Sequence, residues 1–213
     1  ELAVLSDFGE ITMQDINLQG TIPAYIFDSF TNLETIDWSN NDLTGPLPSD
    51  LHLLSNLVIL DVSSNSITGP LPSNWEGLSR LFRFSAHNNL LKGTIPSQMG
   101  EQLEPSFVQV LSLANNTLTG SLPSELGLLE RLVLLDVAYN ALTGSIPLEF
   151  ESLASFRKRL VLKLQGNSFQ GEIPRSICHT VDRDMTTIWA DCDKEFLCCV
   201  DNANIVVNVG PGT

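Results

Sequence analysis

The sequence predicts an α/β solenoid, in which successive coils of the chain each add one strand to a parallel sheet. Two observations predict it. The phrase N-x-[LIF]-x-G-x-[IL]-P occurs six times in the 213 residues, with asparagines at positions 41, 65, 89, 116, 140 and 167. The copies follow one another at intervals of 24 or 27 residues, and periods of about 20 to 50 residues are the mark of stacked repeats.

The second observation is an apolar pattern, L-x-x-L-x-L, upstream of each asparagine. It predicts a short strand with one buried face, because side chains alternate across a strand. The last full copy, Arg159, Leu162 and Leu164, has lost its first apolar residue. The other copies place these residues inward: Leu33, Ile36 and Trp38; Leu57, Leu60 and Val62; Leu81, Phe84 and Ala86; Val108, Leu111 and Leu113; Leu132, Leu135 and Val137.

The asparagine of each copy follows its strand directly. Its amide has two donors and an acceptor, so it can satisfy backbone groups that a turn leaves unpaired. A degenerate first copy, INLQGTIP, has Ile16 in this place, and we expect Ile16 to pack among apolar side chains at the same level. After the G-x-[IL]-P element, a loose helical segment such as SELGLLERL should cross the back of the coil. The residues expected to form one buried ladder are Asn41, Asn65, Asn89, Asn116, Asn140 and Asn167.

These motifs resemble the plant-specific class of leucine-rich repeats over about residues 8–177. That class includes ectodomains of plant receptor-like kinases and receptor-like proteins and secreted polygalacturonase-inhibiting proteins, and similar repeats occur in secreted algal and diatom proteins. The resemblance implies a right-handed superhelix of about seven repeats with a concave parallel sheet. It says little about function, because solenoids are scaffolds whose function lies in surface residues.

Charge narrows the range of partners. The net charge is −14, the first Lys or Arg is Arg80, and eleven of the 25 acidic residues precede it. Nucleic acid, anionic lipid or polyanionic pectin would need a basic face, and none is evident. The acidity either keeps a secreted protein soluble or attracts a basic segment of a partner. No apolar run reaches the roughly 18 residues that membrane insertion requires.

The two ends of the chain are expected to differ. Residues 1–7 have no cysteine, so the amino-terminal edge would lack the cysteine-pair cap that plant ectodomains usually have. Residues 178–213 should form a carboxy-terminal cap and tail, in which disulfides close the apolar end of the last coil under Ile188 and Trp189. An even number of clustered cysteines predicts two disulfides, whose connectivity stays open, and adjacent cysteines would crowd a zinc site. These cysteines are Cys178, Cys192, Cys198 and Cys199.

Residues between the buried strand positions should line the concave face. Asp61, His87 and Ser112 could lie on successive strands, but an open sheet surface excludes no water and no oxyanion hole accompanies them. We therefore expect no catalysis, no cofactor and no metal site. The predicted ligand-binding residues are Asp37, Asp61, Ile59, Arg83, Ser85, His87, Val110, Ser112, Leu134, Asp136, Val161 and Lys163.

Together these features favour an extracellular recognition module, a receptor-like ectodomain that binds a peptide or protein ligand and a co-receptor. A secreted inhibitor of the polygalacturonase-inhibitor type is the first alternative. A structural or ice-binding solenoid is the second, because threonines recur on one flank at Thr44, Thr68, Thr119 and Thr143, although Lys92 and Gln170 interrupt them. The one N-x-[ST] sequon makes Asn115 a candidate glycosylation site.

Overall fold

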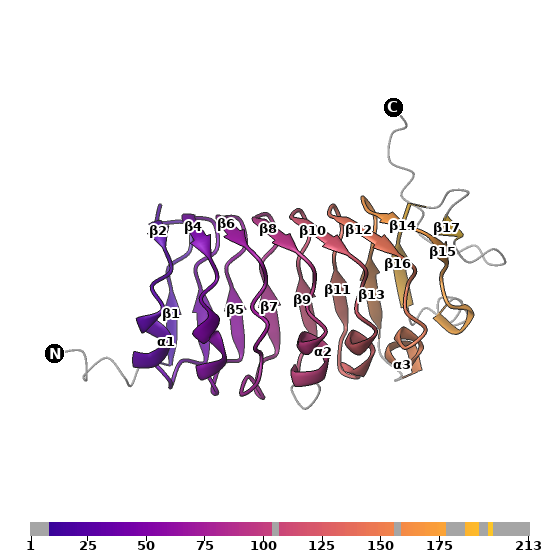
Figure 1. Ribbon diagram of the computed structural model, residues 1–213. Coiled ribbons are helices and arrows are strands. Elements are labelled where there is room, and N and C mark those ends of the chain that lie inside the picture. The colour runs from indigo at the N-terminus through magenta and orange to yellow at the C-terminus, as the bar shows by residue number, and fades with distance from the viewer. Residues whose placement is uncertain (1–8, 104–106, 156–158, 178–185, 192–195, 198–213) are drawn as a thin grey trace.

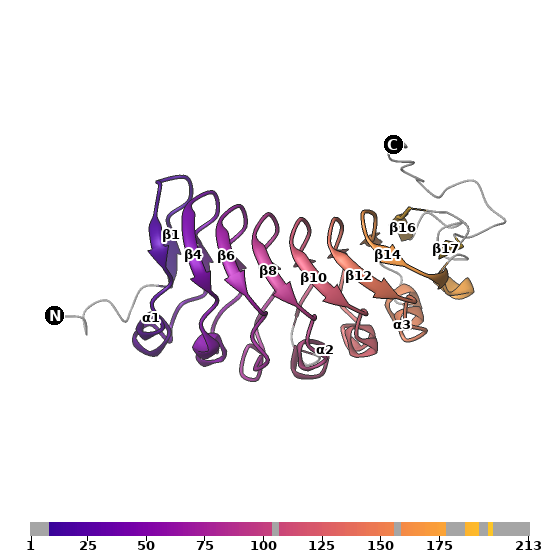
Figure 2. The same cartoon turned by 45° about the horizontal axis from the view of Figure 1, so that its top comes forward.

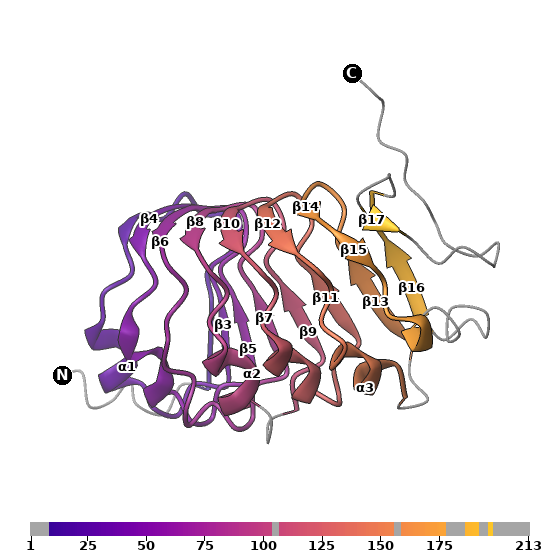
Figure 3. The ribbon, with the colours of Figure 1, turned by 45° about the vertical axis from the view of Figure 1, so that its right-hand side comes forward.

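The structure is a computed structural model and describes residues 9–103, 107–155, 159–177, 186–191 and 196–197. The coils lie side by side in chain order (Figure 1). Each coil contributes a strand to a long sheet, then a strand to a second sheet, and most return through one turn of helix. In Figure 3 the second sheet runs along the upper edge of the molecule and the helices along the lower edge.

The main sheet is parallel and has eight strands. Seven of them come from the repeats, and the eighth comes from the region expected to be only cap and tail. There Ile188 pairs with Leu162 and is fully buried, as Leu162 is. In order the strands are β1 (Glu10–Thr12), β3 (Thr35–Asp37), β5 (Ile59–Asp61), β7 (Arg83–Ser85), β9 (Val110–Ser112), β11 (Leu134–Asp136), β13 (Leu160–Lys163) and β16 (Thr186–Trp189).

A second parallel sheet of seven strands forms where the sequence predicted only a turn. Its strands are tilted across the coils (Figure 2). Thr44 pairs with Ser66 rather than with its repeat equivalent Thr68, so each strand is offset by two residues from the next. The strands are β2 (Gln19–Thr21), β4 (Asp42–Pro46), β6 (Ser66–Gly69), β8 (Leu90–Gly93), β10 (Thr117–Gly120), β12 (Ala141–Gly144) and β14 (Ser168–Phe169); β15 (Gly171–Glu172) pairs separately with β17 (Phe196–Leu197).

The helices on the remaining side are single turns. Pro48 and Pro123 precede two of them in extended conformation, as the G-x-[IL]-P motif leads one to expect. The coil between β6 and β7 has no helix among its residues, all of which are described, and Trp75 fills the space, fully buried. The helices are α1 (Tyr25–Ser29), η2 (Ser49–Leu53), α2 (Gln98–Leu103), η3 (Ser124–Leu128) and α3 (Phe150–Ser155).

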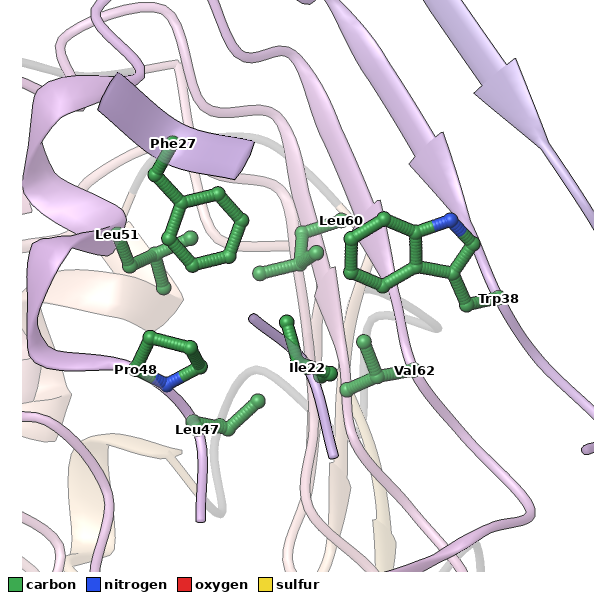
Figure 4. Close-up of a pocket in the computed structure, with 8 residues that line it drawn as sticks. All are labelled: Ile22, Phe27, Trp38, Leu47, Pro48, Leu51, Leu60 and Val62. Carbon is green, nitrogen blue, oxygen red and sulfur yellow. The ribbon is translucent and has the colours of Figure 1, made fainter. Parts of the chain in front are cut away.

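The core runs through the middle of the coils as one continuous apolar stack. Figure 4 shows its first layers, where Phe27 and Leu51 from the helical side face Trp38, Leu60 and Val62 from the main sheet. The space among them does not admit a water molecule. Each coil therefore depends on its neighbours for burial, which makes the stability of the solenoid nearly one-dimensional.

The asparagines link neighbouring coils through their amides. Asn65 shows the pattern: its Nδ2 donates to the carbonyls of Trp38, Val62 and Ser63 at 2.9–3.1 Å, and its Oδ1 accepts from Leu43 N at 2.9 Å. All six asparagines bond in this way to their own coil and to the coil before. Asn89 and Asn116 are buried, and the other four are half-buried.

Ile16 does not pack as expected. Its side chain is 56% exposed, and its backbone N–H donates instead to Asn41 Oδ1 at 3.2 Å. Asp15 and Asn17 on either side have φ of 57°, so the chain makes a left-handed turn that points Ile16 away from the core. The prediction for Ile16 was wrong because a turn without the asparagine amide adopts a different path.

Two glycines on the helical side allow the backbones of neighbouring coils to pack in direct contact. A Cβ atom on Gly100 would overlap the carbonyl group of Glu125 in the next coil, and one on Gly127 would overlap the carbonyl of Glu149. The backbones of α2 and η3 thus pack with no side chain between them.

Replacing Asn89 by Ala should lower the free energy of unfolding by about 1–3 kcal/mol, because the backbone groups of two coils lose their partner in a buried site. Urea denaturation measures the change. Gln170→Ala removes an equivalent amide from an exposed position and should cost little. Equal effects of the two substitutions would contradict a structural role for the buried amide.

Replacing Gly100 by Ala should destabilise the protein by roughly 1–3 kcal/mol, because the added methyl group forces α2 and η3 apart. Gly9→Ala is the matched control, since a Cβ at Gly9 meets no atom within 4 Å. Thermal unfolding of both variants tests the expectation, and an unchanged transition for Gly100→Ala would refute the close approach.

Candidate functional site

The outward side of the main sheet, here called the open face, carries three rows of side chains. The pairing register defines the rows, because directly paired residues in a parallel sheet point to the same side. The first row is Glu10, Thr35, Ile59, Arg83, Val110, Leu134, Val161 and Thr187, and the second is Thr12, Asp37, Asp61, Ser85, Ser112, Asp136, Lys163 and Trp189. The third row lies two residues after the second and is Ser39, Ser63, His87, Ala114, Ala138 and Gln165.

Asp37 and Asp61 are direct neighbours on β3 and β5. Oδ1 of Asp37 accepts hydrogen bonds from Ser39 Oγ at 2.6 Å and Ser39 N at 3.0 Å. Ser63 holds Asp61 in the same way, at 2.5 and 3.0 Å. Both serines are buried, so the two carboxylates are fixed in place with the second oxygen of each directed away from its serine.

No basic side chain of the described residues forms an ion pair with either carboxylate. Strands in a sheet lie about 4.8 Å apart. At about that separation, two negative charges repel by roughly 1–3 kcal/mol, depending on whether the effective dielectric constant is nearer that of a protein surface or of water. The pair therefore favours any cation that can reach both carboxylates.

Asp136 differs from the first two aspartates. Its Oδ2 accepts from Lys163 Nζ on the next strand at 3.0 Å, and the Asp136 side chain is only 12% exposed. From the sequence, Asp37, Asp61 and Asp136 were all predicted to bind ligand. In the structure, the third is already neutralised by a partner within the protein, so the unpaired acidic charge of the second row is confined to the amino-terminal strands.

His87 and Ser112 do contact each other, with Ser112 Oγ 3.2 Å from His87 Nδ1. Asp61 hydrogen-bonds Ser63, and no hydrogen bond joins it to His87, both of which are described residues. Ser112 is buried, as is Ser85 beside it. The two serines and His87 thus form a polar band in the middle of the open face, between the acidic pair and the apolar strands that follow.

The carboxy-terminal half of the open face is apolar. Val110, Leu134 and Val161 are half-buried neighbours in the first row, and Ala114 and Ala138 are buried in the third. Ile59 belongs to the same row but is separated from them by the exposed Arg83.

Trp189 extends this half of the open face. It pairs with Lys163 and is half-buried. Closure of the last coil by disulfides under Ile188 and Trp189 stays a prediction, because the cysteines lie outside the described residues. Ile188 and Ala190 are the buried residues there. The alternation T-x-I-x-A in residues 186–190 carried this information, but it lacks the leucines and the asparagine that identify a repeat.

Asn115 lies exposed in the turn three residues after β9, with φ of 52°. Asn116 next to it is buried in the ladder, and Thr117 Oγ1 donates to Leu91 O at 2.8 Å. Glycosylation of Asn115 stays a prediction. The four cysteines, residues 1–7 and most of 178–213 lie outside the described residues, so the disulfides and the domain limits stay predictions too.

The threonine flank is less regular than the sequence suggested. Because equivalent residues in the second sheet are offset by two positions, Thr44 and Thr68 are not direct partners, and neither are Thr119 and Thr143. Thr44 pairs instead with Thr21 of the first coil. An offset of two residues along strands that are about 4.8 Å apart separates equivalent threonines by roughly 8 Å. The stagger argues against a closely spaced threonine ladder.

The chain matches the family model described as Leucine Rich Repeat at residues 32–54, 56–78, 107–129 and 131–153. Comparison with curated protein sequences gives no significant match. Among solved structures it is similar to a pollen receptor kinase 3, with 32% identity over 76% of each chain and a TM-score of 0.67. The chain belongs to the leucine-rich repeat family, and its receptor-kinase neighbours place it in the plant-type class.

Two longer structures are also similar. One is the leucine-rich repeat ectodomain of the plant membrane receptor kinase GASSHO1/SCHENGEN3 from Arabidopsis thaliana, in complex with CASPARIAN STRIP INTEGRITY FACTOR 2 (32% identity over 87% of this chain and 23% of that one, TM-score 0.73). The other is the plant peptide hormone receptor RGFR1 in complex with RGF2 (28% identity over 92% of this chain and 34% of that one, TM-score 0.76). This chain therefore spans about a quarter to a third of their lengths.

A plant ice-binding protein shares the fold at 20% identity, over 94% of this chain and 79% of that one, with a TM-score of 0.56. At this identity the likeness concerns architecture alone. Among the described residues, no helix is long and apolar enough to cross a membrane, and no three His, Cys, Asp or Glu gather as metal ligands.

The pair Asp136–Lys163 should show measurable coupling in a double-mutant cycle of Asp136→Asn and Lys163→Met. We expect about 0.5–1 kcal/mol, because the carboxylate is largely shielded from water while the ammonium is not. The exposed pair Arg80–Glu34, at 3.3 Å, should give a smaller value in the same denaturation assay. Equal coupling in both pairs would contradict the special position of Asp136.

Proposed function

We propose that this chain is the ligand-recognition module of an extracellular, receptor-like protein, and that it binds an extended peptide or protein segment across its open face. Kinship to receptor-kinase ectodomains supports the general role. The observation that carries the finer proposal is the carboxylate pair Asp37–Asp61, which is held in place and has no basic partner among the described residues. Apolar strands begin at β9, two strands after the strand of Asp61.

The carboxylates of Asp37 and Asp61 are already oriented before a cation binds. Their serine partners hold them in a fixed orientation, so a basic group meets them without the entropic cost of ordering two free side chains. The contrast with Asp136 is informative, because there the protein supplies its own lysine. At Asp37 and Asp61 the cation has to come from outside the described residues, and we propose that the ligand brings it.

The open face has the length for a short peptide. Eight strands at about 4.8 Å span roughly 34 Å, which corresponds to about ten residues of extended chain at about 3.3 Å each. A basic residue at Asp37–Asp61 would place apolar residues of the same ligand over Val110, Leu134 and Val161. The recognised segment is therefore basic at one end and apolar at the other.

This proposal predicts what a random peptide library will select. Displayed peptides of about twelve residues that bind the protein should be enriched in Lys or Arg at one end and in apolar residues at the other. The double substitution Asp37→Asn/Asp61→Asn should weaken a selected peptide at least about tenfold, mainly by slowing association, and added salt should reduce binding to the unchanged protein steeply.

The matched control is Asp50→Asn/Glu76→Gln, which removes the same charge from the helical side of the same coils. It should leave the affinity nearly unchanged. If both double variants weaken binding equally, net charge alone governs it. If neither does, the ligand lies elsewhere and the acidity serves solubility.

A further inference from the structure

Arg83 is an exposed cation in the middle of the open face. The three rows of that face contain two residues with a permanent positive charge, Arg83 and Lys163. Lys163 Nζ donates to Asp136 at 3.0 Å, whereas neither ion pair of the described residues involves Arg83. The two basic residues therefore repeat the contrast among the aspartates, in which one charge is neutralised within the protein and another is not.

The strand register keeps Arg83 apart from the carboxylate of Asp61. Arg83 lies directly between Ile59 on β5 and Val110 on β9, both of which are half-buried apolar residues. Asp61 is two residues further along β5, so the Cα atoms of Asp61 and Arg83 are roughly 8 Å apart. Ser63, two residues beyond Asp61, binds Oδ1 of Asp61 on the side away from Arg83. The guanidinium group thus has apolar neighbours on both adjacent strands.

The position of β7 decides what a bound segment does to this charge. β7 lies between β5, which carries Asp61, and β9, where the apolar strands begin. A segment that contacts both the acidic pair and the apolar strands therefore crosses Arg83 and displaces water from its guanidinium group. An apolar residue there would leave the charge without a partner, and a basic residue would repel it. A carboxylate offsets the lost hydration, because a guanidinium group can donate two parallel hydrogen bonds to it.

We propose that Arg83 binds an acidic side chain within the recognised segment, so that the segment carries a basic residue, then an acidic residue, then apolar residues along the solenoid. This inference rests on the peptide-binding function proposed above, to which it adds the acidic residue and its spacing. The acidic residue is an internal one, because the segment continues past Arg83 onto the apolar strands.

The spacing of the strands fixes the spacing of the two charges in the segment. A cation shared by Asp37 and Asp61 lies midway between β3 and β5, which is roughly 7 Å from β7 when strands are about 4.8 Å apart. Two residues of extended chain cover nearly the same length, at about 3.3 Å each. Residues two apart in an extended chain also point to the same side. The acidic residue is therefore two positions from the basic one, on the side of the apolar residues.

A random library of displayed peptides of about twelve residues, selected on the full chain, tests this order of charges. Peptides that bind the unchanged protein should carry Asp or Glu two positions from a Lys or Arg, toward their apolar residues. Selection on Arg83→Glu should replace that acidic residue by Lys or Arg, because the charge that faces it is reversed. Lys92→Glu is the matched control, since it makes the same charge change at an exposed position of the same coil, on the second sheet. It should select the same peptides as the unchanged protein.

One selected peptide, synthesised with an amidated carboxy terminus, gives the size of the effect. Replacing its acidic residue by the corresponding amide should weaken binding to the unchanged protein at least about fivefold. The same replacement should change binding to Arg83→Gln less than about twofold, because the partner of the carboxylate is already absent. Lys92→Gln should behave like the unchanged protein, and thermal unfolding should show that both variants are folded.

The results distinguish this inference from the function on which it rests. Selected peptides that depend on Asp37 and Asp61 but have no acidic preference, or keep it on Arg83→Glu, would overturn the role of Arg83 and leave the binding site in place. Binding that requires a free carboxy terminus instead of the internal acidic residue would overturn it too. Selected peptides whose affinity ignores Asp37→Asn/Asp61→Asn would contradict the proposed function itself, and this inference with it.

Discussion

The stacking of the coils depends on one interaction, the hydrogen bonds made by the side-chain amide of one asparagine in each coil. Each amide joins backbone groups of its own turn to backbone groups of the coil before, as Asn89 does with Ala86 on its own coil and Val62 and Ile67 on the previous one. The turn after each strand would otherwise leave these groups unpaired inside the protein. Since every coil is fixed to its neighbour in the same register, the strands of the main sheet stay aligned and their outward side chains form straight rows.

Because the outward side chains form straight rows, a single substitution in one coil changes the neighbours of the equivalent side chain in the next. Asp37, Asp61 and Asp136 occupy the same row and hydrogen-bond the backbone or hydroxyl two residues on. They differ in what the neighbouring strand offers, which is another carboxylate for the first two and Lys163 for the third. They differ also in the serine hydroxyl that donates to Asp37 and to Asp61, because Ala138 has none to offer Asp136. The same repeated strand thus carries an unpaired acidic pair at Asp37 and Asp61 and a neutralised carboxylate at Asp136, without any change of fold. In such a protein, the binding properties of the sheet surface depend on which side chains are neighbours on adjacent strands.

A stack of coils also has two ends, and its core needs to be closed at both. At the carboxy-terminal end of the repeats, β16 continues the main sheet, and the side chain of Asp191 accepts the hydrogen bond from Gly166 N. At the amino-terminal end, the described residues leave an apolar cavity between two free strand edges.

The sequence by itself determined the number and order of the repeats, the inward-facing leucines and the place of the asparagines, because these are periodic and each is visible within one coil. It also identified the residues of the open face. It missed the second sheet, the exposure of Ile16, the eighth strand with Trp189, and the cavity. It could not distinguish Asp136 from Asp37 and Asp61. Only the tertiary structure decided these, because they depend on which residue lies beside which in the neighbouring coil.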